Sequence, residues 1–159
     1  MRGARQGVEG RPDRVIAFLL VNGDIDSMIK HTLTSELKDK VILLVDDEPA
    51  ILRATEQGLL ARGFTVKAVE GAEAALKAAH AIRPSLIVSD LVMPGTNGFE
   101  FFQQIQKEQE FAAVPFVFLT AVDDYYAKKF GKEIGGAAYI TKPVDLDELE
   151  RIILEKLGR

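Results

Sequence analysis

Five short apolar runs alternate along the chain with segments in which apolar residues recur at helical spacing. The runs cover residues 41–45, 64–69, 85–89, 116–119 and 137–140. The helical segments cover residues 49–62, 71–82, 98–108, 123–134 and 145–157. Continuous apolar runs of this length are typical of strands buried on both faces, whereas the run from Phe64 to Val69 alternates with polar residues and suits an edge strand. The alternation predicts an α/β fold, a five-stranded parallel sheet with helices on both faces.

Polar side chains follow four of the five predicted strands at the point where each strand ends. They are Asp46 and Asp47 after the first, Asp90 after the third, Thr120 after the fourth and Lys142 after the fifth. Each alone is more typical of a helix cap, a turn, a strand terminator or a solvated charge. Parallel strands end at one edge of the sheet, where α/β proteins place their ligand sites. Together these residues therefore indicate a functional site.

The chemistry of this group favours phosphoryl transfer. Three crowded carboxylates repel each other, and a hard divalent cation with oxygen ligands, Mg²⁺, relieves that repulsion. An ionised aspartate beside Mg²⁺ can attack phosphorus, while an ammonium and a hydroxyl stabilise charge on the transferring oxygens. A Pro and two Gly residues after Asp90 break the chain into a loop, so this carboxylate lies at the rim of the sheet with a loop beside it.

Composition narrows the remaining classes of protein. With 159 residues, no cysteine and a net charge of −4, the chain has the size of one domain, no thiolate chemistry and no basic surface for nucleic acid. The apolar run of residues 15–21 is too short to span a membrane and lacks a signal-peptide cleavage pattern, so we expect a cytoplasmic protein with no membrane partner.

Residues 1–39 differ in composition from the rest of the chain. We expect an N-terminal extension that is loosely ordered, followed by one domain at residues 40–159. Two alternatives stay open for the extension. It can form an extra helix packed on the domain, or it can be an upstream segment that is not always made, since Met28 also offers a start.

From about Lys40 to Gly158 the chain resembles the receiver domain of bacterial two-component response regulators, of the single-domain, chemotaxis-regulator type. The resemblance rests on four motifs in order: VILLVDDEP, DLVMPGTNG, FLTA and YITKP. It implies a flavodoxin-like fold with strand order 2-1-3-4-5. It also implies a signalling module rather than a conventional enzyme, one that catalyses only its own phosphotransfer and dephosphorylation.

The resemblance assigns roles to individual residues of the metal and phosphoryl site. Asp90 resembles the phosphoacceptor and also a metal ligand. Asp47 resembles a direct Mg²⁺ ligand, and Asp46 its neighbour that acts partly through water. Val92 would add its backbone carbonyl to the metal.

A second group of residues resembles the family's switch. Thr120 would turn its hydroxyl toward the phosphoryl group, Lys142 would pair with it, and Tyr139 would turn inward after Thr120. The resemblance also implies a cis peptide bond between Lys142 and Pro143.

The expected partners are a histidine kinase or histidine phosphotransfer protein as phosphodonor, and a downstream protein effector. The effector would bind the face made by the fourth helix, the fifth strand and the fifth helix, residues 123–157. Because the chain ends soon after Gly158, we expect no DNA-binding output domain. We also expect a monomer or a phosphorylation-dependent dimer.

Two alternatives to the receiver interpretation stay open. One is a haloacid-dehalogenase-type phosphatase, but that family carries its nucleophile in an Asp-x-Asp motif after the first strand, where Asp46 and Asp47 are adjacent here. The other is a pseudo-receiver that binds partners without phosphorylation.

Overall fold

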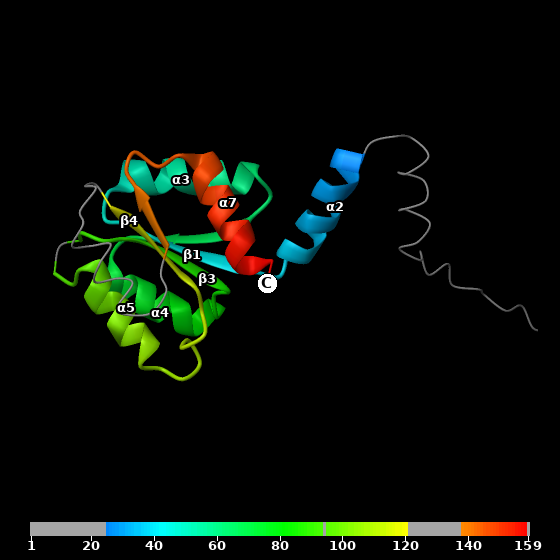
Figure 1. Ribbon diagram of the computed structural model, residues 1–159. Helices are drawn as coiled ribbons and strands as arrows, with labels where there is room; N and C mark the ends of the chain where they lie inside the picture. Colours follow the sequence, from blue (N-terminus) through cyan, green and yellow to red (C-terminus); the bar gives the residue numbers. More distant parts are fainter. Residues whose placement is uncertain (1–24, 94, 121–137, 159) are drawn as a thin grey trace, which may run out of the picture. The chain divides into compact units, whose positions relative to one another are not determined.

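The computed structural model describes residues 25–93, 95–120 and 138–158, and its elements carry the labels of Figure 1. The chain divides into two compact units, Met1–Glu36 and Leu37–Arg159. Helix α2 (Ile25–Leu37) lies in the segment predicted to be an extension. The loose order of that extension and its boundary at residues 39 and 40 stay predictions.

Five strands of the second unit form one parallel sheet. In order along the chain its elements are β1 (Val41–Val45), α3 (Pro49–Ala61), β2 (Thr65–Val69), α4 (Ala72–Ile82), β3 (Leu86–Asp90), α5 (Gly98–Gln106), β4 (Phe116–Thr120), β5 (Ala138–Thr141) and α7 (Leu146–Leu157). The strand order is β2-β1-β3-β4-β5, and every neighbouring pair is parallel. The predicted fold is confirmed, and β2, the run with alternating polar residues, lies at one edge of the sheet.

Two apolar layers enclose the sheet, one on each face. Ile42 and Leu44 of β1 pack with α3 and α7, whereas Leu43 and Val45 of the same strand pack with α4 and α5. This division follows from the pleat, which sends successive side chains to opposite faces. Figure 1 shows α3 and α7 on one side of the strands and α4 and α5 on the other. A sheet buried on both faces leaves its strand ends as the place for polar chemistry.

The helices begin where the sequence provides a start signal. Pro49 occupies the first turn of α3, where its missing N–H costs no hydrogen bond. The side chain of Asn97 accepts a hydrogen bond from the backbone N–H of Glu100 at the start of α5. Asp145 caps α7, because its side chain accepts hydrogen bonds from the backbone N–H groups of Asp147 and Glu148. The start of each helix determines where the preceding strand-to-helix loop ends. These loops carry the polar residues of the predicted site.

Some expectations fall on residues that the structure does not describe. The helix expected at residues 123–134 lies there, and with it half of the surface expected to bind an effector. None of the described helices has both the length and the hydropathy of a membrane-spanning segment.

Candidate functional site

The polar residues predicted from the sequence come together at the carboxyl edge of the sheet. Asp90 is the last residue of β3 and Thr120 the last of β4, and both are buried. Their strands are in register, with Asp90 opposite Leu119 and Thr120 opposite Thr141. Asp46 follows β1 directly, and its backbone N–H donates to the carbonyl of Val69. The register alone thus places these strand ends side by side.

The ammonium of Lys142 lies between two carboxylates that come from different strand ends. Its Nζ is 3.0 Å from Asp46 Oδ2 and 3.1 Å from Asp90 Oδ2. The side chains of Lys142, Asp46 and Asp90 are 11%, 1% and 6% exposed. Water therefore screens these charges little, and the shared ammonium is what lets two buried carboxylates sit side by side.

Burial and charge act against each other on the pKa of Asp90. Burial raises this pKa above its usual range because it disfavours the ionised form, and the nearby charge of Asp46 adds to the rise. Contact with Lys142 lowers the pKa again but does not cancel the effect of burial. For Lys142, burial lowers the pKa, yet hydrogen bonds to Asp46 and Asp90 outweigh it, and the net pKa is raised. The ionised form of Asp90 is thus disfavoured by burial, and a further cation beside it would stabilise that form.

The loop after Asp90 is held close to the strand that precedes it. The backbone N–H of Val92 faces Asp90 Oδ1 at 3.4 Å, and the N–H of Gly98 donates to the carbonyl of Leu91 at 2.8 Å. A Cβ atom at Gly98 would lie 2.4 Å from the backbone oxygen of Asp90, closer than real Cβ atoms approach backbone. Only glycine fits there, so Gly98 sets how the loop returns past the aspartate. In the sequence this glycine marked only the start of a helix.

Three carboxylates of this edge form a group that can hold a metal ion. Ligand oxygens of Asp46, Asp47 and Asp90 all lie within 4.8 Å of one another. Asp46 also accepts a hydrogen bond from the backbone N–H of Glu48 at 2.9 Å, so it positions the loop as well. Oxygen donors at this separation suit a hard divalent cation such as Mg²⁺, and the residues present therefore fit the ion expected from the sequence. The pairing of Asp46 with Lys142 was not predicted, because it depends on the register of two distant strands.

Tyr139 lies beside the site on β5. Its ring stacks on Phe118 with centroids 5.3 Å apart, and burial raises the pKa of its hydroxyl to about 12. Among the described residues, the hydroxyl has no hydrogen-bond partner.

The backbone just beyond β5 is tied to the end of β4. The backbone N–H of Lys142 donates to the carbonyl of Thr120, and the Lys142–Pro143 peptide bond is cis, as the resemblance implied. Thr120 and Tyr139 thus lie on the neighbouring strands β4 and β5, and Lys142 follows the end of β5.

Comparison with known proteins agrees with this geometry. The family model for the response regulator receiver domain matches residues 42–154. The chain is 35% identical to PilH of Pseudomonas aeruginosa over 112 residues, which are 70% of this chain and 93% of PilH. It is also 35% identical to response regulator Rre1 of Synechocystis over 119 residues, 74% of this chain but 52% of Rre1. The chain thus spans about half the length of Rre1 and of several other curated relatives.

Solved structures show the same architecture. Chemotaxis protein CheY4 of Vibrio cholerae superimposes with a TM-score of 0.69 at 27% identity, over 73% of this chain and 97% of that one. A CheY-like receiver domain protein of Methanospirillum hungatei gives 0.68 at 30% identity, over 75% and 94%. The residues matched by the family model contain the acidic pocket, which is the group of Asp46, Asp47 and Asp90 together with Lys142. The protein belongs to the response regulator receiver domain family, and its second unit is a signalling domain of two-component systems rather than a conventional enzyme.

Proposed function

We propose that this protein accepts a phosphoryl group on Asp90 from a histidine kinase or a histidine phosphotransfer protein. The observation that carries the proposal is the ammonium of Lys142, which bridges Asp90 and Asp46 at the carboxyl edge of the sheet. An exposed cation would add little to such a site, whereas a buried one holds a fixed positive charge where the oxygens of a transferring group would lie.

In the proposed transfer, a carboxylate oxygen of Asp90 attacks the phosphorus of a phosphohistidine. The new P–O bond forms as the P–N bond breaks, and the electron pair of the broken bond returns to the histidine of the donor. Lys142 then pairs with a phosphoryl oxygen in place of one of its present carboxylate contacts. Thr120 offers a hydroxyl from the end of β4, and its place on that strand puts it at the same edge of the sheet.

Mg²⁺ is the proposed cofactor of this step. Asp46, Asp47, Asp90 and the backbone carbonyl of Val92 would hold it. When bound, the ion neutralises charge on the phosphoryl oxygens and keeps Asp90 ionised against the effect of burial. In this proposal Asp90 supplies the nucleophile, Lys142 supplies one fixed cation, and Mg²⁺ is the second cation.

Tyr139 is the proposed reporter of phosphorylation. Its hydroxyl has no hydrogen-bond partner among the described residues, so a turn of this ring breaks no bond that the structure shows. If Thr120 and Lys142 are drawn toward a phosphoryl group, the packing beside Tyr139 on β5 changes. We propose that this change reaches a downstream effector through the surface of residues 123–157, of which β5 and α7 are described.

The setting proposed for this activity is the cytoplasm, where a histidine kinase presents its phosphohistidine. A monomer or a phosphorylation-dependent dimer would suffice, because every residue proposed for the transfer comes from one chain. The two-component family implies the kinase, whereas the individual kinase and effector are matters for experiment.

Intact mass after incubation with Mg²⁺ and a small-molecule phosphodonor tests the proposal. Wild type should gain one phosphoryl group, and Asp90→Asn should gain none. A parallel sample with a chelator in place of Mg²⁺ should stay unmodified. If folded wild type gains no phosphoryl group from the small donor or from phosphorylated kinases, the pseudo-receiver interpretation replaces this one.

A further inference from the structure

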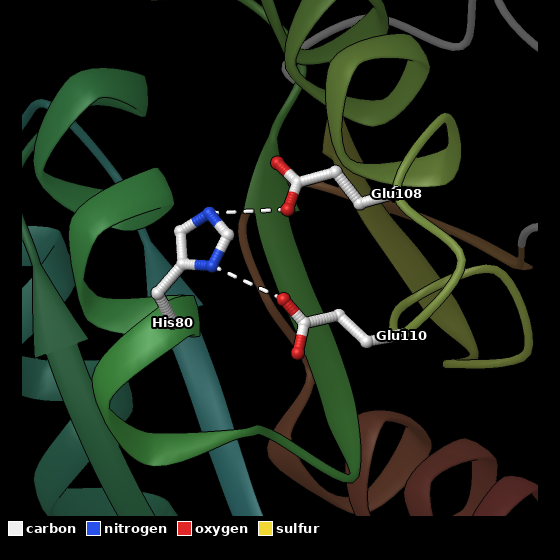
Figure 2. A group of neighbouring side chains, drawn as sticks. All are labelled: His80, Glu108 and Glu110. Carbon is white, nitrogen blue, oxygen red and sulfur yellow. Dashed lines mark ion pairs between the residues drawn. The ribbon is translucent and has the colours of Figure 1, made fainter.

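A second cluster of metal-ligating side chains lies outside the acidic pocket. His80, in the last turn of α4, faces Glu108 and Glu110, which follow α5 (Figure 2). Helices of this fold end at the edge of the sheet where the strands begin, so the cluster is at the opposite edge from Asp90. The side chains of His80, Glu108 and Glu110 are 50%, 36% and 39% exposed, which leaves room for an ion to enter from water.

The imidazole of His80 meets a carboxylate at each of its two nitrogens. Nε2 is 3.1 Å from Glu108 Oε2, and Nδ1 is 3.2 Å from Glu110 Oε1. A carboxylate can only accept hydrogen bonds, and a neutral imidazole has one donor nitrogen and one acceptor nitrogen. With a neutral ring, therefore, one nitrogen lone pair faces a carboxylate, an arrangement that a cation between them would stabilise.

The surroundings distinguish the two glutamates. The second oxygen of Glu110, Oε2, is 3.7 Å from the guanidinium of Arg83, so this carboxylate already shares a positive charge. Glu108 Oε2 faces Nε2 at 3.1 Å. Two donor atoms on one tetrahedral zinc ion are about 3.3–3.6 Å apart, given Zn–N and Zn–O bonds of about 2.0–2.2 Å. The two atoms are therefore slightly closer than zinc ligands, and a small shift of the partly exposed Glu108 side chain would bring them to that separation.

Neighbouring contacts hold the side chains of the cluster in place. The ring of His80 meets the buried ring of Phe111 edge to face, with centroids 5.3 Å apart. The backbone around the glutamates is tied by hydrogen bonds from the N–H of Glu108 to the carbonyl of Ile105 and from the N–H of Phe111 to that of Glu108. His80 also lies at the C-terminal end of α4, where the helix dipole favours positive charge.

We propose that this cluster binds a borderline divalent cation such as Zn²⁺ through His80 Nε2 and Glu108, with water completing the coordination. Glu110 is a positioning residue, because it accepts from Nδ1–H and so keeps Nε2 deprotonated toward the metal, as carboxylates beside zinc-bound histidines do. The ion ties the end of α4 to the segment after α5.

Zn²⁺ titration in excess Mg²⁺ tests this assignment, because Mg²⁺ fills the acidic pocket and prefers oxygen ligands. The chain has two histidines, His31 and His80, so their imidazole resonances can be followed separately. We expect Zn²⁺ to shift or broaden the signals of His80 and leave those of His31 unchanged. Zn²⁺ that perturbs neither histidine, or both equally, would overturn the site.

Matched variants identify the ligands. His80→Gln and Glu108→Gln should each weaken Zn²⁺ binding by about tenfold or more, since loss of a mere supporting partner already costs about 10–100-fold. Glu73→Gln is the control, because Glu73 lies exposed on the same helix outside the cluster, and it should bind as wild type does. Wild-type affinity in either ligand variant would contradict the proposal.

Glu110→Ala tests the positioning role through the tautomer of His80, which the imidazole ¹⁵N shifts report. In wild type the ring should carry its proton on Nδ1, and in the variant the two tautomers should mix while Zn²⁺ affinity falls. An unchanged tautomer in a folded variant would show that Glu110 does not orient the ring.

Discussion

The acidic pocket and the His80 cluster each bring carboxylates and a basic side chain together. They differ in burial, which determines how strongly their charges interact. In the pocket, Lys142 is 11% exposed and holds two carboxylates that are almost fully enclosed. In the cluster, every member is at least about one third exposed, and water and salt screen its charges. The same kinds of residue therefore produce a strongly coupled set of charges in one place and a loosely held metal site in the other.

The largest difference in the free energy of unfolding should appear between a buried and an exposed lysine when each is removed. Lys142→Met leaves Asp46 and Asp90 facing each other without a cation, and breaking a buried pair in this way costs about 3–5 kcal/mol. Lys77→Met, which removes an exposed lysine that pairs with Glu73 on α4, should cost less than about 0.5 kcal/mol. Urea unfolding in the absence of Mg²⁺ measures both. Equal losses would mean that burial does not set the importance of the pocket's charges.

Mg²⁺ should stabilise the protein through the pocket alone. An ion that binds only the folded state adds about 2.7 kcal/mol to the free energy of unfolding when its concentration is about 100 times its Kd. The stabilisation should persist in His80→Gln and vanish in Asp47→Asn, as thermal unfolding with and without chelator would show. Loss of the response in His80→Gln would mean that Mg²⁺ binds at the His80 cluster instead.

Asp90→Asn should stabilise the protein in chelator at neutral pH. Because the pKa of Asp90 is raised in the folded state, the folded protein binds this proton more readily than the unfolded chain does, and the ionised carboxylate opposes folding. The cost is complete above the raised pKa and is lost as the pH falls through it. The variant's advantage in thermal midpoint should therefore shrink on acidification. A variant less stable than wild type at every pH would show that the contact with Lys142 outweighs burial.

The smallest effect is expected at the cluster itself. Without added metal, His80→Gln should change the free energy of unfolding by less than about 1 kcal/mol, since exposed ion pairs contribute little. Chemical denaturation at neutral pH gives this value. A loss comparable to that of Lys142→Met would indicate that the contacts of His80 are structural, and the contrast between the two regions would fail.

The two regions also differ in how far the sequence predicts them. The sequence predicts the acidic pocket because its residues follow apolar runs, and parallel strands end at one edge of the sheet. Asp90 and Lys142 are therefore expected to lie close together. The contact of Lys142 with Asp46, and the need for glycine at position 98, depend on register and on the return of a loop. Neither leaves a periodic signal in the sequence.

The His80 cluster left no signal at all. Glu108 and Glu110 lie in an irregular segment after α5, and His80 lies one helix earlier, so no motif spacing joins them. Their meeting depends on how α4 and α5 pack side by side on one face of the sheet. Sequence patterns indicate which face a helix buries, but they do not determine which exposed residues of neighbouring helices touch.

The most direct test of the central claim locates the phosphoryl group within the chain. Wild type is phosphorylated in the presence of Mg²⁺, the acyl phosphate is reduced with borohydride, and the modified residue is identified by fragment mass. We predict conversion of Asp90 and no other carboxylate, with Glu108 and Glu110 unmodified. Modification at another residue, or an unmodified Asp90 in a chain that has gained a phosphoryl group, would contradict the claim that the buried pocket is the phosphoacceptor site.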